Sequence, residues 1–256
     1  MNARTPQNSG GVLARRPGRR ADGFTMIEIA LSLAIIGILP YGLGVQQENT
    51  NETVINHDAS VLMDAVCNGQ QGLDDLTNYV YAITNFQVAY PAGTLNTYGF
   101  TNGAPSFLTN GMNIVGLLST PEYTDNSGNP TNNLFSGGYS NHIVAYVHSM
   151  SGPAIEKPPQ NNDIVVGDSF GYHILCVNAP VAADNNSLTN SYNSYNRQLA
   201  ANLHELRLTF LWPQQPNGKV GPRRQTFRTM VAGQLAQNPV NGNLYFYQPQ
   251  SFVNAP

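Results

Sequence analysis

The chain has 256 residues, of which 41% are hydrophobic and only 11% are charged. An average soluble domain is about 25% charged, so a coiled coil, a solvated bundle of charged helices, an acidic disordered chain and a basic nucleic-acid binder are all disfavoured. The polarity comes instead from uncharged side chains, together with 24 Gly and 17 Pro. The length is sufficient for one or two domains with a buried core.

The positive charge is concentrated at the N-terminus. Five of the 12 basic residues lie in the first 20 positions: Arg4, Arg15, Arg16, Arg19 and Arg20. Residues 1–23 therefore carry a net charge of +4 and the rest of the chain −7. The overall value of −3 is a cancellation between two unlike segments.

An apolar run follows the arginines at residues 24–45, with Glu28 as its one charge. As a helix these 22 residues would span about 33 Å, close to the roughly 30 Å of a bilayer's hydrocarbon core. Because basic residues precede the run, we expect its N-terminus in the cytoplasm and the rest of the chain across the inner membrane.

Two simpler interpretations explain this region less well. A secretory signal has an apolar core of about 7–15 residues followed by a small-residue cleavage site, and here the run is longer and lacks such a site. A plain membrane anchor does not explain Glu28, since a carboxylate near the centre of a membrane helix costs roughly 2.5 kcal/mol or more.

Gly23 followed by Phe24, Thr25, Met26, Ile27 and Glu28 resembles the N-terminus of type IV prepilins and type II secretion pseudopilins. The resemblance implies that a prepilin peptidase cuts between Gly23 and Phe24 and methylates the amine of Phe24. It also implies that Glu28 acts in assembly, where its carboxylate could pair with the Phe24 amine of a neighbouring subunit and offset the cost of both buried charges.

The family's fold is the α+β arrangement of a long N-terminal helix, partly transmembrane, packed on an antiparallel sheet. The implied organisation is a basic leader at 1–23, an N-terminal helix at 24–86 with its membrane and assembly part at 24–45, and an extracytoplasmic head at 87–256. One departure is Pro40, which with Gly42 and Gly44 could kink the helix earlier than the family's usual proline does.

The periodicity of the remaining chain agrees with that layout. Apolar residues recur at helical spacing between residues 48 and 86, although Gly69 and Gly72 weaken the middle. Residues 90–140 are rich in turn formers and predict long loops, with a short element near 113–119. Alternating apolar residues predict strands at 142–148, 163–166, 172–177, 206–212, 225–231 and 244–247.

The run from 206 to 233 contains Leu211, Trp212 and Pro213 followed by Arg223 and Arg224. It resembles a group of prepilin-like proteins encoded in verrucomicrobial cassettes, the Verru_Chthon cassette type. Together with Arg228, the two arginines form the one basic cluster of the head. Because acidic residues outnumber basic ones there, we expect no nucleic-acid partner.

Several patterns that could carry chemistry have a simpler interpretation. Gly167 to Gly171 matches the G-x-S-x-G nucleophile elbow around Ser169, with Asp184 and His204 later in the chain, but a strand rather than a helix follows it, so a glycine-bounded turn is favoured. His142 and His148 share a strand face without a further close ligand. Residues 125–129 look rich in oxygen ligands but lack an EF-hand's terminal Glu, so a solvated turn starting at Asp125 is favoured over a calcium loop.

Cys67 and Cys176 are the only cysteines, and the expected topology exports both. An oxidising compartment permits a disulfide, which would close a loop of about 110 residues and stabilise the fold by at most nearly 5 kcal/mol. The alternative is two buried free thiols that act as small hydrophobic side chains.

We therefore expect a minor prepilin-like subunit of a type IV pilus or a type II secretion pseudopilus that is not an enzyme. Its expected partners are the prepilin peptidase, other pilin or pseudopilin subunits and inner-membrane lipid. We expect no catalytic residue, metal or cofactor. The rival hypothesis is a membrane-anchored extracytoplasmic hydrolase or carbohydrate-binding domain that uses a pilin-like signal.

Overall fold

The computed structural model describes residues 26–68, 74–101, 107–131, 137–151, 170–181, 198–215 and 217–252, with the backbone alone at 35–47. The chain divides into two units, Met1–Gln47 and Glu48–Pro256, which are described separately below. Helix α1, Met26–Asn68, contributes residues to both.

In the first unit, α1 begins at Met26 and carries Glu28 in its first turn. Large apolar side chains at its start are exposed: Met26, Ile27, Ile29, Leu31 and Leu33. Within the parts of the chain that the structure describes, no helix combines the length and apolar character needed to cross a membrane. The predicted membrane segment, 24–45, begins outside these parts.

In the second unit, the remaining part of α1 is amphipathic. Ile55, Ala59, Leu62 and Val66 follow one another at four- and three-residue spacings and are buried completely. The prediction of a helix continuing to residue 86 was wrong, because α1 ends at Asn68 and a short 3-10 helix, η1, Asp74–Asn78, precedes strand β1, Val80–Tyr90.

A β-bulge explains that error. Val80 pairs with Val147 and Ile83 with Ala145, and the register shifts between Val80 and Ala82. The extra residue brings Val80 and Ile83 to the same buried face although they lie three positions apart. A bulged strand therefore produced the three-residue spacing that is typical of a helix.

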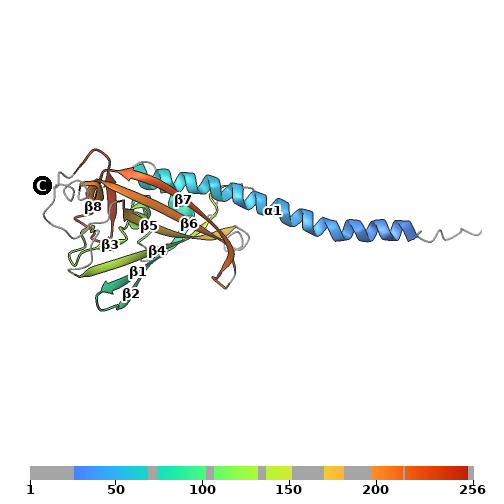
Figure 1. Ribbon diagram of the computed structural model, residues 1–256, viewed down its shortest axis with the longest axis horizontal. Coiled ribbons are helices and arrows are strands. Elements are labelled where there is room, and N and C mark those ends of the chain that lie inside the picture. The colour runs from blue at the N-terminus through green and yellow to red at the C-terminus, as the bar shows by residue number, and fades with distance from the viewer. Residues whose placement is uncertain are drawn as a thin grey trace, which may run out of the picture. The chain divides into compact units, whose positions relative to one another are not determined.

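The second unit contains an antiparallel sheet in the order β2-β1-β4-β5-β6-β7, with β3 added beside β4 (Figure 1). Besides β1, its strands are β2 Leu95–Thr101, β3 Tyr123–Thr124, β4 Gly138–His148, β5 Gly171–Pro180, β6 Leu203–Gln214 and β7 Val220–Ala232. The inner face of the sheet is largely apolar, because buried apolar residues alternate with more exposed ones along β4 and β6. For example, Ile143, Ala145 and Val147 are all buried.

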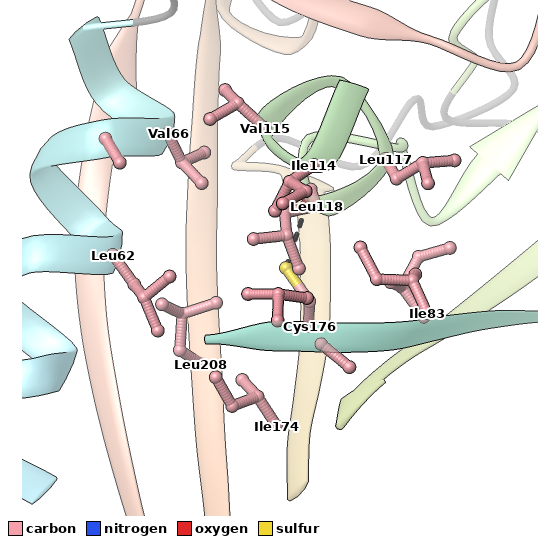
Figure 2. Close-up of a cluster of buried hydrophobic side chains, with 14 of the residues drawn as sticks. Leu62, Val66, Ile83, Ile114, Val115, Leu117, Leu118, Ile174, Cys176 and Leu208 are labelled. Carbon is pink, nitrogen blue, oxygen red and sulfur yellow. Dashed lines mark hydrogen bonds between the residues drawn. The ribbon is translucent and has the colours of Figure 1, made fainter. Parts of the chain in front are cut away.

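Helix α2, Gly111–Leu118, completes the core. Asn110 caps its N-terminus by accepting a hydrogen bond from the Met112 amide at 2.7 Å. Side chains of α1, α2 and the inner sheet face meet in one cluster, with Leu62 and Val66 on one side and Ile114 and Leu118 on another (Figure 2).

A second, two-stranded antiparallel sheet consists of β8 Gln234–Gln237 and β9 Tyr245–Gln248. It packs closely on α2. A Cβ atom at Gly116 would lie 2.8 Å from the Phe246 ring and 3.0 Å from Leu244, so this helix position has no room for a larger residue.

The predicted α+β class with an antiparallel sheet is confirmed. The expected strands at 142–148, 172–177, 206–212, 225–231 and 244–247 and the element near 113–119 all correspond to observed elements. Strand β2 was not predicted and lies where loops were expected. The expected strand at 163–166 lies outside the described residues.

Candidate functional site

The processing and assembly residues lie at the start of the chain's described part. Gly23 and Phe24 fall outside it, so the cleavage and methylation site is not described. Glu28 lies in the first turn of α1 with an exposed side chain, among exposed apolar neighbours such as Ile27 and Ile29. A carboxylate at a helix N-terminus is favoured by the helix dipole, whatever further partner it has.

Asp58 joins α1 to the sheet through a buried carboxylate. It accepts hydrogen bonds from the Met150 amide at 2.9 Å, the Ser151 hydroxyl at 2.7 Å and the Tyr172 hydroxyl at 2.8 Å. Burial, reinforced by the charge of Asp58, raises the pKa of Tyr172 well above its usual value, so Tyr172 remains a donor. Sequence reasoning missed Asp58, although a lone acid between Ile55 and Ala59 on an apolar helix face was a usable signal.

The two cysteines are free thiols. Cys176 is buried in the core, where its Sγ donates a hydrogen bond to the Leu118 carbonyl at 2.8 Å (Figure 2). Burial raises its pKa to about 12, which makes it unreactive, and burial followed by the charge of Asp64 raises the pKa of Cys67. The disulfide considered from sequence is therefore not formed here, and the alternative of two thiols packed as apolar groups describes the structure.

The described residues do not assemble the serine-hydrolase pattern. Ser169 and Asp184 lie outside the described residues, and the residues after Gly171 form strand β5, so the helix that a nucleophile elbow requires does not follow the motif.

The histidines do not assemble into a ligand set. His148 stacks on Tyr81 with ring centroids 4.7 Å apart, and His173 meets Tyr146 edge-on at 4.4 Å. Burial lowers the pKa of both. Among the described residues, no three His, Cys, Asp or Glu side chains lie close enough together to hold a metal ion.

The predicted turn at residues 125–129 is closed by Asp125 itself. Its Oδ1 accepts hydrogen bonds from the amides of Ser127 and Asn129, both at 2.8 Å. Partial burial disfavours the charge of Asp125, but the hydrogen bonds from Asn129, Ser127 and Gly128 outweigh it and lower its pKa. The carboxylate oxygens that could have ligated calcium thus serve the turn.

Tyr245 fastens this turn to the small sheet. Its hydroxyl donates a hydrogen bond to the Gly128 carbonyl at 2.7 Å. Gly128 has a φ of +87°, and a Cβ there would lie 2.5 Å from the Gln237 amide nitrogen, so the turn needs glycine at this position. Burial, followed by the charge of Asp125, raises the pKa of Tyr245 to about 12 despite an opposing hydrogen bond with Gln237.

A polar pocket of about 280 Å³ lies between this fastened turn and the inner face of β1 and β4, and sequence reasoning did not find it. Its wall includes Asn85, Gln87, Tyr98, Asn141 and Tyr245. The inner positions of β1 change here from apolar, at Val80 and Ile83, to polar, at Asn85 and Gln87. That change within one strand face was the available signal, but the partners of these residues come from distant segments.

A larger, half-open cavity of about 670 Å³ is lined by His204 and by several prolines, including Pro121 and Pro180. His204 is buried, and neither of its ring nitrogens has a hydrogen-bond partner among the described residues. Burial lowers its pKa to about 4. A weaker interaction with the Ala201 backbone raises the pKa, although its geometry does not meet that of a hydrogen bond.

The basic cluster of the head is partly neutralised. Arg223 forms an ion pair with Glu48 of α1, and Arg228 lies 3.6 Å from a carboxylate oxygen of Glu205. Because two of the three arginines face carboxylates, these residues have little free positive charge to offer an anion.

No family model matches the chain, and neither a curated protein nor a solved structure matches it. The function proposed for this chain is therefore inferred from its own residues.

Proposed function

We propose that this protein is a prepilin-like subunit, processed by a prepilin peptidase and assembled into a type IV pilus or a type II secretion pseudopilus. The observation that carries the proposal is the combination, in one short segment, of the basic leader, Gly23, Phe24 and Glu28 with the apolar run that follows. In this account the chain is the substrate of an enzyme rather than an enzyme.

The helix supports the proposal in two ways. Its first turns expose apolar side chains, among them Met26, Ile29 and Leu33, which is the kind of surface that lipid or neighbouring apolar helices would cover. Its residues 48–68 pack on an antiparallel sheet, as an assembly helix attached to a head would. Before assembly, residues 24–45 would hold the protein in the inner membrane with the head outside the cytoplasm.

Glu28 has a defined task in this proposal. After cleavage, the new amino group of Phe24 and the carboxylate of Glu28 would both enter an apolar fibre interior, where each unpaired charge is costly. A pair formed between Phe24 of one subunit and Glu28 of the next removes that cost and fixes the register between subunits.

The test is Glu28→Ala in cells that carry the prepilin peptidase and the assembly machinery. We expect cleavage and methylation at Phe24 to continue while incorporation into fibres is lost, measured by immunoblot of sheared fibres and by mass spectrometry. Glu52→Ala removes an exposed acid further along the same helix and should assemble normally. Normal assembly of Glu28→Ala would remove the proposed role.

A further inference from the structure

The pocket beside β1 and β4 has features that the proposed assembly role does not use. None of its lining residues carries a charge, and six are amides: Asn85, Gln87, Asn126, Asn141, Gln237 and Asn243. We propose that this pocket binds the ring of a neutral sugar, so that the head is a carbohydrate-recognition unit. The hydrogen bonds that the pocket can offer a ligand depend on which way its amides are oriented.

Asn141 determines that orientation. It is buried, and its Nδ2 group lies 3.1 Å from the Pro121 carbonyl, which can only accept a hydrogen bond. Its Oδ1 must then face the other way, where it accepts from Asn85 Nδ2 and Gln87 Nε2, both at 3.2 Å. Flipping any one amide would place two acceptors or two donors against each other.

Two fixed acceptors result. Because Asn85 and Gln87 both give their NH₂ groups to Asn141, their carboxamide oxygens are directed away from it. Asn85 Oδ1 is buried and has no hydrogen-bond partner among the described residues. A buried acceptor without a partner is costly, so a hydrogen-bond donor that reached Asn85 Oδ1 would be favoured.

The donor that fits is a neutral hydroxyl. A cationic donor would find no carboxylate in the lining, and the nearby Asp125 already accepts hydrogen bonds from its own turn. A hydroxyl of the ligand can also accept a hydrogen bond. The Thr124 hydroxyl in the pocket wall can donate one, because its oxygen accepts from Asn141 Nδ2 at 3.4 Å and its own proton remains available. Adjacent acceptors and donors of this kind match the hydroxyl groups of a sugar.

Aromatic rings supply the second half of the recognition. Tyr98 lies on β2 directly opposite Asn85 in the sheet register, and its side chain is 47% exposed at the pocket. The C–H groups of a sugar ring carry a slight positive charge and pack well on the negative face of an aromatic ring. The volume of about 280 Å³ is at the small end for ligand pockets, which suits a single sugar ring or the end of a glycan rather than a nucleotide cofactor.

The test uses the full chain in a detergent without a sugar headgroup and a panel of glucose, galactose, mannose and N-acetylglucosamine, followed by saturation-transfer NMR and titration. We expect at least one of these sugars to bind. Tyr98→Ala should weaken that binding about tenfold or more, since the ring contact is lost. Tyr90→Ala is the matched control, because Tyr90 is an equally exposed tyrosine (51%) of the same sheet outside the pocket, and it should bind as the unmodified chain does.

Asn85→Leu tests the acceptor independently of the ring and should also abolish binding. Circular dichroism spectra and unfolding midpoints are compared to confirm that both pocket variants are folded. If Asn85→Leu does not fold, the binding measured for Tyr98→Ala decides the outcome. Absence of a saturation-transfer signal from all four sugars would overturn the proposal. Binding that Tyr98→Ala leaves unchanged, or binding of Ca²⁺ alone in this pocket, would also overturn it.

Discussion

The two parts of helix α1 use the same kinds of residue for opposite purposes. Near its start, Ile29, Leu31 and Leu33 are exposed, whereas Ile55, Leu62 and Val66 are completely buried against the sheet. The helix therefore consists of two parts with different partners. One part is stabilised by the head of its own chain, and the other has an apolar surface for which, in our proposal, the partner is lipid or another subunit.

A matched pair of leucine truncations tests whether the two parts of the helix contribute differently to stability. Leu62→Ala removes a fully buried side chain and should lower the free energy of unfolding of the head by about 2–5 kcal/mol. Leu31→Ala, at a side chain 56% exposed, should change it by less than about 0.5 kcal/mol. Urea unfolding followed by the fluorescence of Trp212, the single tryptophan, measures both. Equal effects would contradict the division of the helix.

The hydrogen bonds of Asp58 give a second test of how the buried part of the helix is held to the head. Asp58→Ala leaves the Met150 amide and the Ser151 and Tyr172 hydroxyls without their acceptor and should destabilise the head by about 3 kcal/mol. Asp64→Ala is the control on the same helix, since Asp64 is exposed. The same fluorescence assay applies, and a loss below about 1 kcal/mol for Asp58→Ala would show that Asp58 does not anchor the helix.

A smaller effect, the pH dependence of the free energy of unfolding, tests the surroundings of His204 on strand β6. The pKa of His204 is about 4 in the folded protein and about 6.5 when unfolded, so between these values the unfolded state binds more protons. Stability from this group is complete above pH 6.5 and decreases as the pH falls, by about 2 kcal/mol at pH 5. His204→Phe should flatten that part of the profile relative to the unmodified chain, while His142→Gln, at an exposed histidine, should not. Parallel profiles for His204→Phe and the unmodified chain would exclude this source.

The sequence predicted well where each residue's environment follows from its neighbours in the chain. The alternation of Leu206, Leu208 and Phe210 determined both a strand and its buried face, and that strand is β6. The N-terminal motif likewise depends on contiguous residues, and it stays a prediction about positions 23 and 24 that lie outside the described structure.

The sequence predicted poorly where long-range pairing decides. The bulge in β1 imitated helical spacing. Strand β2 lies at the edge of the sheet and none of its residues is buried, so its sequence carried no alternation. The polar pocket depends on the register that places Gln87 beside Asn141 and on a turn held by Tyr245. No local pattern shows that Asn141 will share one hydrogen-bond network with two amides that lie 54 and 56 positions earlier in the chain.

The most direct test of the central claim is the mass of the mature N-terminus. The protein is produced in cells with a prepilin peptidase, purified and digested, and its N-terminal peptide is sequenced by mass spectrometry. Our account predicts a chain that begins at N-methylated Phe24, with residues 1–23 removed. An intact Met1, or a cut beyond Val45, would contradict it.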